Sequence, residues 1–415
     1  MIYRRNPGGR ASAPLQLTYM KPAIIKQLRA YVIDPGESGA DYHNQPGGHW
    51  IVDTHIANPM SVYEPYKANR MSWGINALGT VIVEAELADG TVGIGVSIGG
   101  EPACYIVEKH LNRFVEGREL RDVERIFDQM WRATMPYGRK GLTIQAISAV
   151  DLALWDLLGK LRGEPVYALL GGKTKDRLPV YATTARPDLA KKMGFVASKF
   201  PCEYGPADGD DGLRKNLETA RTHREAVGPD FPLMIDCYMA LTVPYAIKYA
   251  KALAPYNIRW IEEFLPPDDI DGYVQVKQAV AGAMLLTTGE HEYMRYGFRE
   301  LIARKACDIL QPDINWVGGI TEARRIVAMA SAYDIPVIPH GSSVFSYHLQ
   351  YAFTNCPMAE FLVMSPKADT IVPLFGDLFV NEPLPKDGWI DIPDTPGWGV
   401  ELNRQGLKLK RPYEH

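Results

Sequence analysis

Eight short apolar runs recur between residues 178 and 364, separated by stretches of helix length with polar faces. Apolar runs that alternate with helical segments are typical of βα units and predict a parallel sheet. Eight such units over about 200 residues match a TIM-type (β/α) barrel, in which functional side chains lie at the C-terminal ends of the strands. The runs are LPVYATT (178–184), FVASKF (195–200), FPLMIDC (231–237), IRWIEE (258–263), MLLTTGE (284–290), CDILQPD (307–313), IPVIPHG (335–341) and AEFLVM (359–364).

The pattern of apolar and polar residues before the barrel is different. It contains a strand, a long loop and a hairpin around Asp89-Gly90, which predict an antiparallel sheet. Three amphipathic helical stretches follow, at 101–117, 119–135 and 143–163. This part therefore predicts an α+β domain.

A chain of 415 residues is too long for one small core, so we expect several parts. The expected fold class is α/β: a barrel at 173–375 with an N-terminal α+β capping domain at 21–172. A C-terminal segment, 376–415, is expected to return and complete the capping domain. The Gly, Pro and Arg content of residues 1–20 predicts a flexible arm, with packing on a neighbouring subunit as the alternative.

Composition narrows the classes of partner. The net charge is −4 and its signs are interspersed, so nucleic acid is not expected and a small molecule is. The five cysteines lack CxxC spacing, which argues against a zinc site or a disulfide framework and fits a reducing cytoplasm. No apolar run approaches the ~18 residues of a membrane span, so no membrane is expected. We also expect a homo-oligomer, with the number of subunits left open.

Three successive predicted strands end in an acid: Asp236, Glu262 and Glu290. They lie about one βα unit apart, so consecutive strands present one carboxylate each at the same rim. Three converging carboxylates repel one another unless a hard cation joins them, and Mg²⁺ prefers such all-oxygen ligands. The alternative is that each acid caps the helix that follows it.

Two glutamates stand side by side at the end of one of these strands. Alternation along a strand places Glu262 and Glu263 on opposite sides. We expect Glu262 to be the metal ligand. Glu263 is expected to pair with a basic residue or to cap the next helix.

The next two strand ends carry Asp313 and His340. An aspartate on a neighbouring strand can hold an imidazole by one nitrogen and raise its basicity, which would make His340 a general base. A structural histidine is the alternative. Lys199 on the second strand either faces the metal site, where it could neutralise an enolate, or faces solvent. Glu360 on the eighth strand either hydrogen-bonds the enolate when protonated or forms an ion pair.

This order of residues, acids on strands three to five and then Asp and His behind an α+β domain, resembles the enolase superfamily, mandelate racemase branch. The resemblance covers nearly the whole chain. The segments ARPDLAKKMGF, IEEFLPPDD, GEHEY, IPHGSSVFS and the ending VELNR to LKRPYEH are similar to acid-sugar dehydratases of that branch. The resemblance implies Mg²⁺-dependent removal of an α-proton from a 6-deoxy sugar acid and formation of its 2-keto-3-deoxy product.

The resemblance also implies roles for single residues. It assigns Mg²⁺ binding to Asp236, Glu262 and Glu290, the base to His340, its activation to Asp313 and transition-state stabilisation to Glu360. The Lys-x-Lys pattern of the racemases is interrupted, because Pro201 follows Lys199 by two positions. A base on one face only favours elimination over racemisation.

The loop at 37–74 is long for a compact domain, and such loops are often lids over a site. By the resemblance His43 and Arg70 would bind the substrate, since its hydroxyl and carboxylate oxygens need polar partners. The roles of His49, His55 and His291 are left open. His291 should point away from the metal unless its strand has already ended.

Two other classes of protein compete with a dehydratase. An amidohydrolase needs a His-x-His on the first strand, and the run at 178–184 has none. A catalytically silent metal-binding barrel would have no need of His340 and Asp313 together. A dehydratase for another aldonic acid also remains open.

Overall fold

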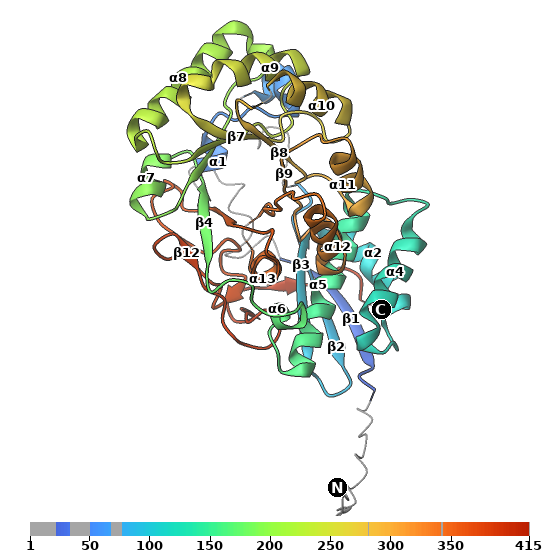
Figure 1. Ribbon diagram of the computed structural model, residues 1–415. Coiled ribbons are helices and arrows are strands. Elements are labelled where there is room, and N and C mark those ends of the chain that lie inside the picture. Colours follow the sequence, from blue (N-terminus) through green and yellow to red (C-terminus); the bar gives the residue numbers. More distant parts are fainter. Residues whose placement is uncertain (1–21, 34–49, 68–76, 281, 342, 415) are drawn as a thin grey trace, which may run out of the picture.

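The computed structural model describes residues 22–33, 50–67, 77–280, 282–341 and 343–414, and it contains a curved parallel sheet beside an antiparallel one (Figure 1). The parallel strands lie in the order β10-β4-β5-β6-β7-β8-β9, and β10 pairs with β4. Their bounds are β4 Leu178–Thr183, β5 Ser198–Pro201, β6 Leu233–Asp236, β7 Ile258–Glu262, β8 Leu285–Thr288, β9 Ile309–Leu310 and β10 Ala359–Leu362. The expected α/β barrel architecture is therefore present.

The seventh apolar run, 335–341, lies beside β9 but forms no regular strand among the described residues, which corrects the expectation of eight. It pairs with the neighbouring run through isolated parallel bridges, one of which joins Asp313 to His340. Pro336 and Pro339 have no backbone N–H and cannot donate ladder hydrogen bonds. The run keeps the parallel register and still brings His340 to the rim.

Helices cover the outer face of the parallel sheet (Figure 1). In α8, for example, Leu213, Ala220 and Val227 are buried at intervals of two helical turns, and the opposite face is polar. The helix bounds are α7 Pro187–Lys192, α8 Gly209–Val227, α9 Val243–Ala252, α10 Ile270–Ala279, α11 Met294–Ala303, α12 Gly319–Ser331 and α13 Val344–Ala352.

The capping sheet has the order β14-β1-β2-β3. Its strands are β1 Ile25–Ile33, β2 Thr80–Leu87, β3 Val92–Ile98 and β14 Leu409–Lys410. Because β14 pairs with β1, the chain's end returns to the capping sheet as expected (Figure 1). The helices of this part are α1 Trp50–Asp53, α2 Gly100–Ile106, α3 Asn112–Val115, α4 Val123–Thr134, α5 Leu142–Arg162 and α6 Val166–Leu169.

Helix α5 packs closely on β3 because two glycines allow it. A Cβ at Gly95 would lie 2.0 Å from the carbonyl oxygen of Ala149, and one at Gly93 would lie 2.2 Å from that of Ala153. Helix α5 also has the length and hydropathy of a membrane span, which corrects the expectation that no segment does. Since 89% of its most apolar window is buried inside the protein, its hydropathy is explained by its place in the core.

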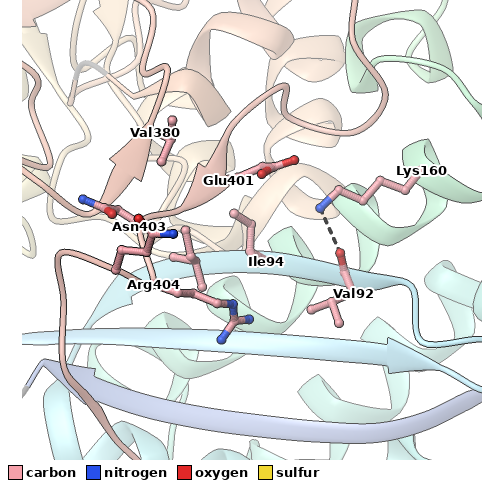
Figure 2. A pocket seen from close by; sticks show the side chains of 9 residues that line it. Val92, Ile94, Lys160, Val380, Glu401, Asn403 and Arg404 are labelled. Carbon is pink, nitrogen blue, oxygen red and sulfur yellow. Dashed lines mark hydrogen bonds between the residues drawn. The ribbon is translucent and has the colours of Figure 1, made fainter.

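The C-terminal segment also packs against β3 and α5. Asp156 of α5 accepts hydrogen bonds from the backbone N–H groups of Trp398 (2.9 Å) and Ile94 (2.8 Å), which joins the three parts. Nearby, a hollow of about 500 Å³ lies between β3, Lys160 and residues 401–405, and Lys160 donates to the carbonyl of Val92 beside it (Figure 2). The remaining strands of this segment are β11 Phe379–Val380, β12 Trp389–Ile390 and β13 Glu401–Leu402.

His348 of α13 joins three distant parts of the chain. Its Nδ1 accepts a hydrogen bond from the backbone N–H of Tyr167 (3.1 Å), and its Nε2 lies 3.2 Å from the carbonyl oxygen of Trp398. Because Nδ1 is the acceptor, Nε2 carries the proton and donates. Burial lowers the pKa of His348 to about 3, so the folded protein keeps this ring neutral.

This arrangement predicts a pH-dependent stability. In the unfolded chain a histidine titrates near pH 6.5. Below that pH the unfolded state binds a proton that the folded state does not bind. The contribution of neutral His348 to the free energy of unfolding is complete above pH 6.5. It decreases by about 1.4 kcal/mol per pH unit as the pH falls from there toward 3. His348→Gln should therefore reduce the loss of unfolding free energy between pH 7 and pH 5.5, measured by urea denaturation. His223, whose pKa burial lowers to about 4, provides a second variant with the same expected effect. If the free energy of unfolding depends on pH in both variants as it does in the wild type, the two histidines are not the source of the pH dependence.

Candidate active site and metal centre

The polar residues of the site lie one layer above an apolar layer inside the barrel. Tyr181 of β4 contacts Trp260 of β7 edge to face at 5.6 Å although these strands are not neighbours, so both rings point inward. The buried cluster around them consists of Tyr181, Ala197, Met234, Trp260, Ile309 and Ile338. Because side chains alternate along a strand, the residue two positions further faces the same interior. Those residues are Thr183, Lys199, Asp236, Glu262, Gln311 and His340.

The three expected metal ligands come together. Asp236, Glu262 and Glu290 each place a carboxylate oxygen within 4.8 Å of the others, and the register of β6 and β7 sets Asp236 beside Glu262. Burial raises the pKa of Glu290 to about 7. Its Oε2 is buried and has no hydrogen-bond partner among the described residues. A buried carboxylate oxygen without a donor, in a cluster of oxygen ligands, fits Mg²⁺.

Glu262 has several hydrogen-bond donors around it. Its Oε1 accepts from the Nζ of Lys199, and its Oε2 accepts from Gln311 Nε2 (2.6 Å) and Trp260 Nε1 (3.3 Å). Burial raises the pKa of Glu262 to about 8, although Lys199 opposes the shift. Gln311 was not anticipated from the sequence. Its position two residues beyond the inward-facing Ile309 was the signal that could have found it.

Glu263 does not lie on the side that strand alternation predicted. β7 ends at Glu262, and Glu263 has a φ of +39°, so the alternation stops there. Its carboxylate accepts from the backbone N–H of His291 (3.1 Å) and lies 2.8 Å from the Nδ1 of that ring, which confirms the expected pairing with a basic residue. Glu263, Glu290 and His291 form a second group whose ligand atoms lie within 4.8 Å of one another. The expectation that Glu263 faces away from the metal site was therefore wrong.

His291 is directed toward the acids for a related reason. β8 ends at Thr288, before Glu290, so the condition under which His291 would turn inward is met. Its Nδ1 lies 3.9 Å from Glu290 Oε1. Burial would lower the pKa of His291, but Glu263 and Glu290 outweigh it and raise the pKa to about 9.

His340 and Asp313 form the expected pair. His340 Nδ1 lies 2.9 Å from Asp313 Oδ2, and His340 Nε2 lies 3.3 Å from Glu290 Oε1. Burial would lower the pKa of His340, but the charge of Glu290 and the hydrogen bond with Asp313 raise it well above its usual range. The indole of Trp316 packs 5.4 Å from the imidazole. One nitrogen of the ring is thus held by Asp313 while the other faces the acid cluster, an arrangement that can hold or release a proton at the rim.

Lys199 is fully buried, so the alternative of a solvent-facing lysine was wrong. Its Nζ lies 3.0 Å from Glu360 Oε1. Glu360 also accepts from Thr183 Oγ1 (2.5 Å) and from the backbone N–H of Gly341 (3.1 Å). Burial would raise the pKa of Glu360, but Lys199 and His340 lower it to about 2. In this arrangement Glu360 is a carboxylate in an ion pair and does not act as a protonated donor.

The described part of the expected lid reaches the barrel. His55 Nδ1 lies 2.5 Å from the carbonyl oxygen of Glu203, and its ring stacks on Tyr204 at 4.8 Å. Glu203 follows β5 closely, so this segment docks at the rim that carries Lys199. His43, His49 and Arg70, which the sequence analysis singled out in this loop, lie outside the described residues.

The two acid groups predict different responses to substitution. Mg²⁺ at a concentration 100 times its Kd should stabilise the chelator-treated protein by about 2.7 kcal/mol, seen as a rise in melting temperature. Glu262→Gln should abolish this rise because it removes a charged ligand, and Glu263→Gln should retain it because that carboxylate is held by His291. The reverse result would place the ion in the second group. A full rise in both variants would exclude both assignments.

Comparisons with known proteins identify the family of the chain. Residues 51–171 match the family described as mandelate racemase / muconate lactonizing enzyme, N-terminal domain, and residues 184–406 match the enolase C-terminal domain-like family. An L-rhamnonate dehydratase of Saccharopolyspora erythraea is 55% identical over 391 residues, which cover 94% of this chain and 99% of that protein.

Two solved structures are similar over nearly their whole length. The rhamnonate dehydratase from Gibberella zeae complexed with Mg has 50% sequence identity and a TM-score of 0.90, covering 94% of this chain and 97% of that chain. The 3,6-anhydro-D-galactonate cycloisomerase from Zobellia galactanivorans has 28% identity and a TM-score of 0.73, covering 93% and 100%. With both family models matched and a relative 55% identical, the chain belongs to the enolase superfamily, in its mandelate racemase and muconate lactonizing enzyme branch.

Proposed function

We propose that this protein is a Mg²⁺-dependent L-rhamnonate dehydratase, which converts L-rhamnonate to 2-keto-3-deoxy-L-rhamnonate and water. The observation that carries the proposal is the contact of the acid cluster with the base pair: His340 Nε2 lies 3.3 Å from Glu290 Oε1. The same rim therefore offers a cation site and a proton acceptor. The 55% identity to an L-rhamnonate dehydratase over nearly the full length of both chains selects the substrate.

Asp236, Glu262 and Glu290 would hold Mg²⁺, which when bound would draw electron density from the substrate carboxylate and make the α-proton more acidic. Glu290 has a second effect on the neighbouring base. Its charge raises the pKa of His340, and a carboxylate that shares its charge with a cation does so less. His340 can then be neutral, as a base must be.

We assign the proton transfers to His340. Asp313 holds Nδ1, so Nε2 is the nitrogen that takes the proton from C2. The electron pair of the C2–H bond forms the enolate and then the C2–C3 double bond as the C3 hydroxyl leaves. His340 returns its proton to that hydroxyl, which departs as water, and the enol converts to the 2-keto acid. Both transfers use one group, so the elimination is syn.

Lys199 and Glu360 would stabilise the developing negative charge together. Glu360 is ionised beside Lys199, so the ammonium group is the donor that can approach the enolate. Glu360 keeps that ammonium in place and also holds the backbone of Gly341, next to the base. His43 and Arg70 remain our candidates for binding the substrate's hydroxyl and carboxylate oxygens. We also propose that the enzyme is a cytoplasmic homo-oligomer, in keeping with its five free, buried cysteines.

The substrate is tested with a panel of aldonic acids. Purified protein with Mg²⁺ should release a 2-keto-3-deoxy acid from L-rhamnonate with the highest kcat/KM, and L-mannonate and L-lyxonate should react more slowly. One methyl contact discriminates by only about 1–3 kcal/mol, so some turnover of these relatives is expected. A different preferred acid would identify another aldonate dehydratase. No product from any acid, with the Mg²⁺ response intact, would indicate a catalytically silent barrel.

The one-base mechanism is tested at C2 of the substrate. His340→Asn should lose dehydration and the exchange of the C2 proton with deuterated solvent together, because both need the same nitrogen. Asp313→Asn should weaken both rates by about 10²–10⁴-fold, the range typical of general base catalysis. Exchange at the wild-type rate in His340→Asn would show that another residue is the base.

A further inference from the structure

The loop at 313–317, which follows β9, is fastened to the capping domain at Asn315. The Nδ2 of Asn315 donates to the carbonyl oxygen of Val96 (2.7 Å), and the Oγ of Ser97 donates to the carbonyl oxygen of Asn315 (2.6 Å). Val96 and Ser97 lie on β3, an edge strand of the capping sheet. Strand β3 of the capping domain therefore forms hydrogen bonds with the 313–317 loop of the barrel.

The same residue also supports the base pair. The backbone N–H of Asn315 donates to Asp313 Oδ1 (2.7 Å), while Asp313 Oδ2 faces the imidazole of His340. The Oδ1 of Asn315 accepts from the Oγ of Ser343 (3.0 Å), which is the N-cap of α13 and follows His340 by three residues. Asn315 thus contacts the supports of both members of the pair.

The side chains that make these contacts are buried, so breaking the hydrogen bonds is costly. Asn315 is 9% exposed, Ser97 2% and Ser343 1%. A buried donor or acceptor that loses its partner costs about 1–3 kcal/mol, so each of these groups disfavours a loop position in which its bond is broken. The network therefore fixes the loop relative to β3.

We propose that Asn315 is a positioning residue through which the edge of β3 sets the orientation of the Asp313–His340 pair. The proposal rests on the proposed function, because it takes His340 as the base. Asn315 acts through its contacts with Asp313 and Ser343 and does not exchange protons itself. A shift of a catalytic group by 1 Å can cost about 100-fold in rate, so the loss of this tether should be visible in kcat.

The test is Asn315→Leu, which keeps the backbone N–H and much of the side-chain volume but removes the bonds to Val96 and Ser343. The kcat for dehydration of L-rhamnonate and the C2 exchange rate should fall together by about 10–100-fold. The KM and the Mg²⁺ concentration that gives half the thermal shift should stay within about threefold, since neither substrate-binding groups nor carboxylates are changed. Ser97→Ala, which weakens the tether from the capping side, should show a smaller loss of the same kind.

A matched control removes a bond between the same two domains away from the base. The indole Nε1 of Trp155 donates to Thr321 Oγ1 (2.9 Å), which joins α5 to α12. Thr321→Val should lower the melting temperature but leave kcat and the exchange rate unchanged. If Asn315→Leu behaves like Thr321→Val, with lowered stability and wild-type kcat, then Asn315 only joins the domains and the inference is overturned.

A double variant shows whether the effect passes through the Asp313–His340 pair, which Asp313→Asn disrupts. If it does, Asp313→Asn combined with Asn315→Leu should be about as slow as Asp313→Asn alone. Fully additive losses would overturn the inference. A wild-type protein that dehydrates none of the acids overturns the proposed function, and the inference with it. Wild-type turnover with an unaffected Asn315→Leu overturns the inference alone.

Discussion

The burial of four carboxylates around one ammonium group is the constraint on which the rest of the structure depends. Asp236, Glu262, Glu290 and Glu360 lie at one rim of the barrel, and only Asp236 retains appreciable exposure. Taking an ion out of water costs several kcal/mol unless partners replace the water. The Nζ of Lys199 contacts three of the four but leaves a surplus of negative charge. Binding a divalent cation offsets that surplus, so the repulsion among the buried carboxylates favours the metal.

Much of this rim could be predicted from the sequence, because strand alternation and the βα period are local rules. The acids at 236, 262 and 290 were expected at one edge of the sheet, and the structure brings them together. The pair of Asp313 and His340 was expected for the same reason and lies at hydrogen-bonding distance. Asp236 and Glu262 are the last residues of β6 and β7, so for them counting by two from an apolar interior position is sufficient.

The features that were not predicted correctly depend on where strands end or on how the domains dock, and the apolar pattern specifies neither. Glu263 was assigned to the wrong side because its positive φ starts a turn, and a turn ends the alternation. The seventh run looked like a strand, but two prolines leave it with only isolated bridges. Asn315 could not have been found from spacing at all. Its partners on β3 lie more than 200 residues away along the chain, so only the docking of the two domains brings them together.

The proposed chemistry differs from racemisation for an electrostatic reason. A racemase needs a proton acceptor on each face of the substrate carbon, and a lysine serves as one only if it can lose its proton. Burial would lower the pKa of Lys199, but Glu262 and Glu360 outweigh burial and raise it well above its usual range. Glu360, which is not among the proposed metal ligands, lies 3.0 Å from Nζ and favours the ammonium form of Lys199, which can stabilise negative charge. With Pro201 where a second lysine could stand, His340 is our one proposed base, on one face of the substrate, and this is why we propose elimination of the C3 hydroxyl in place of racemisation.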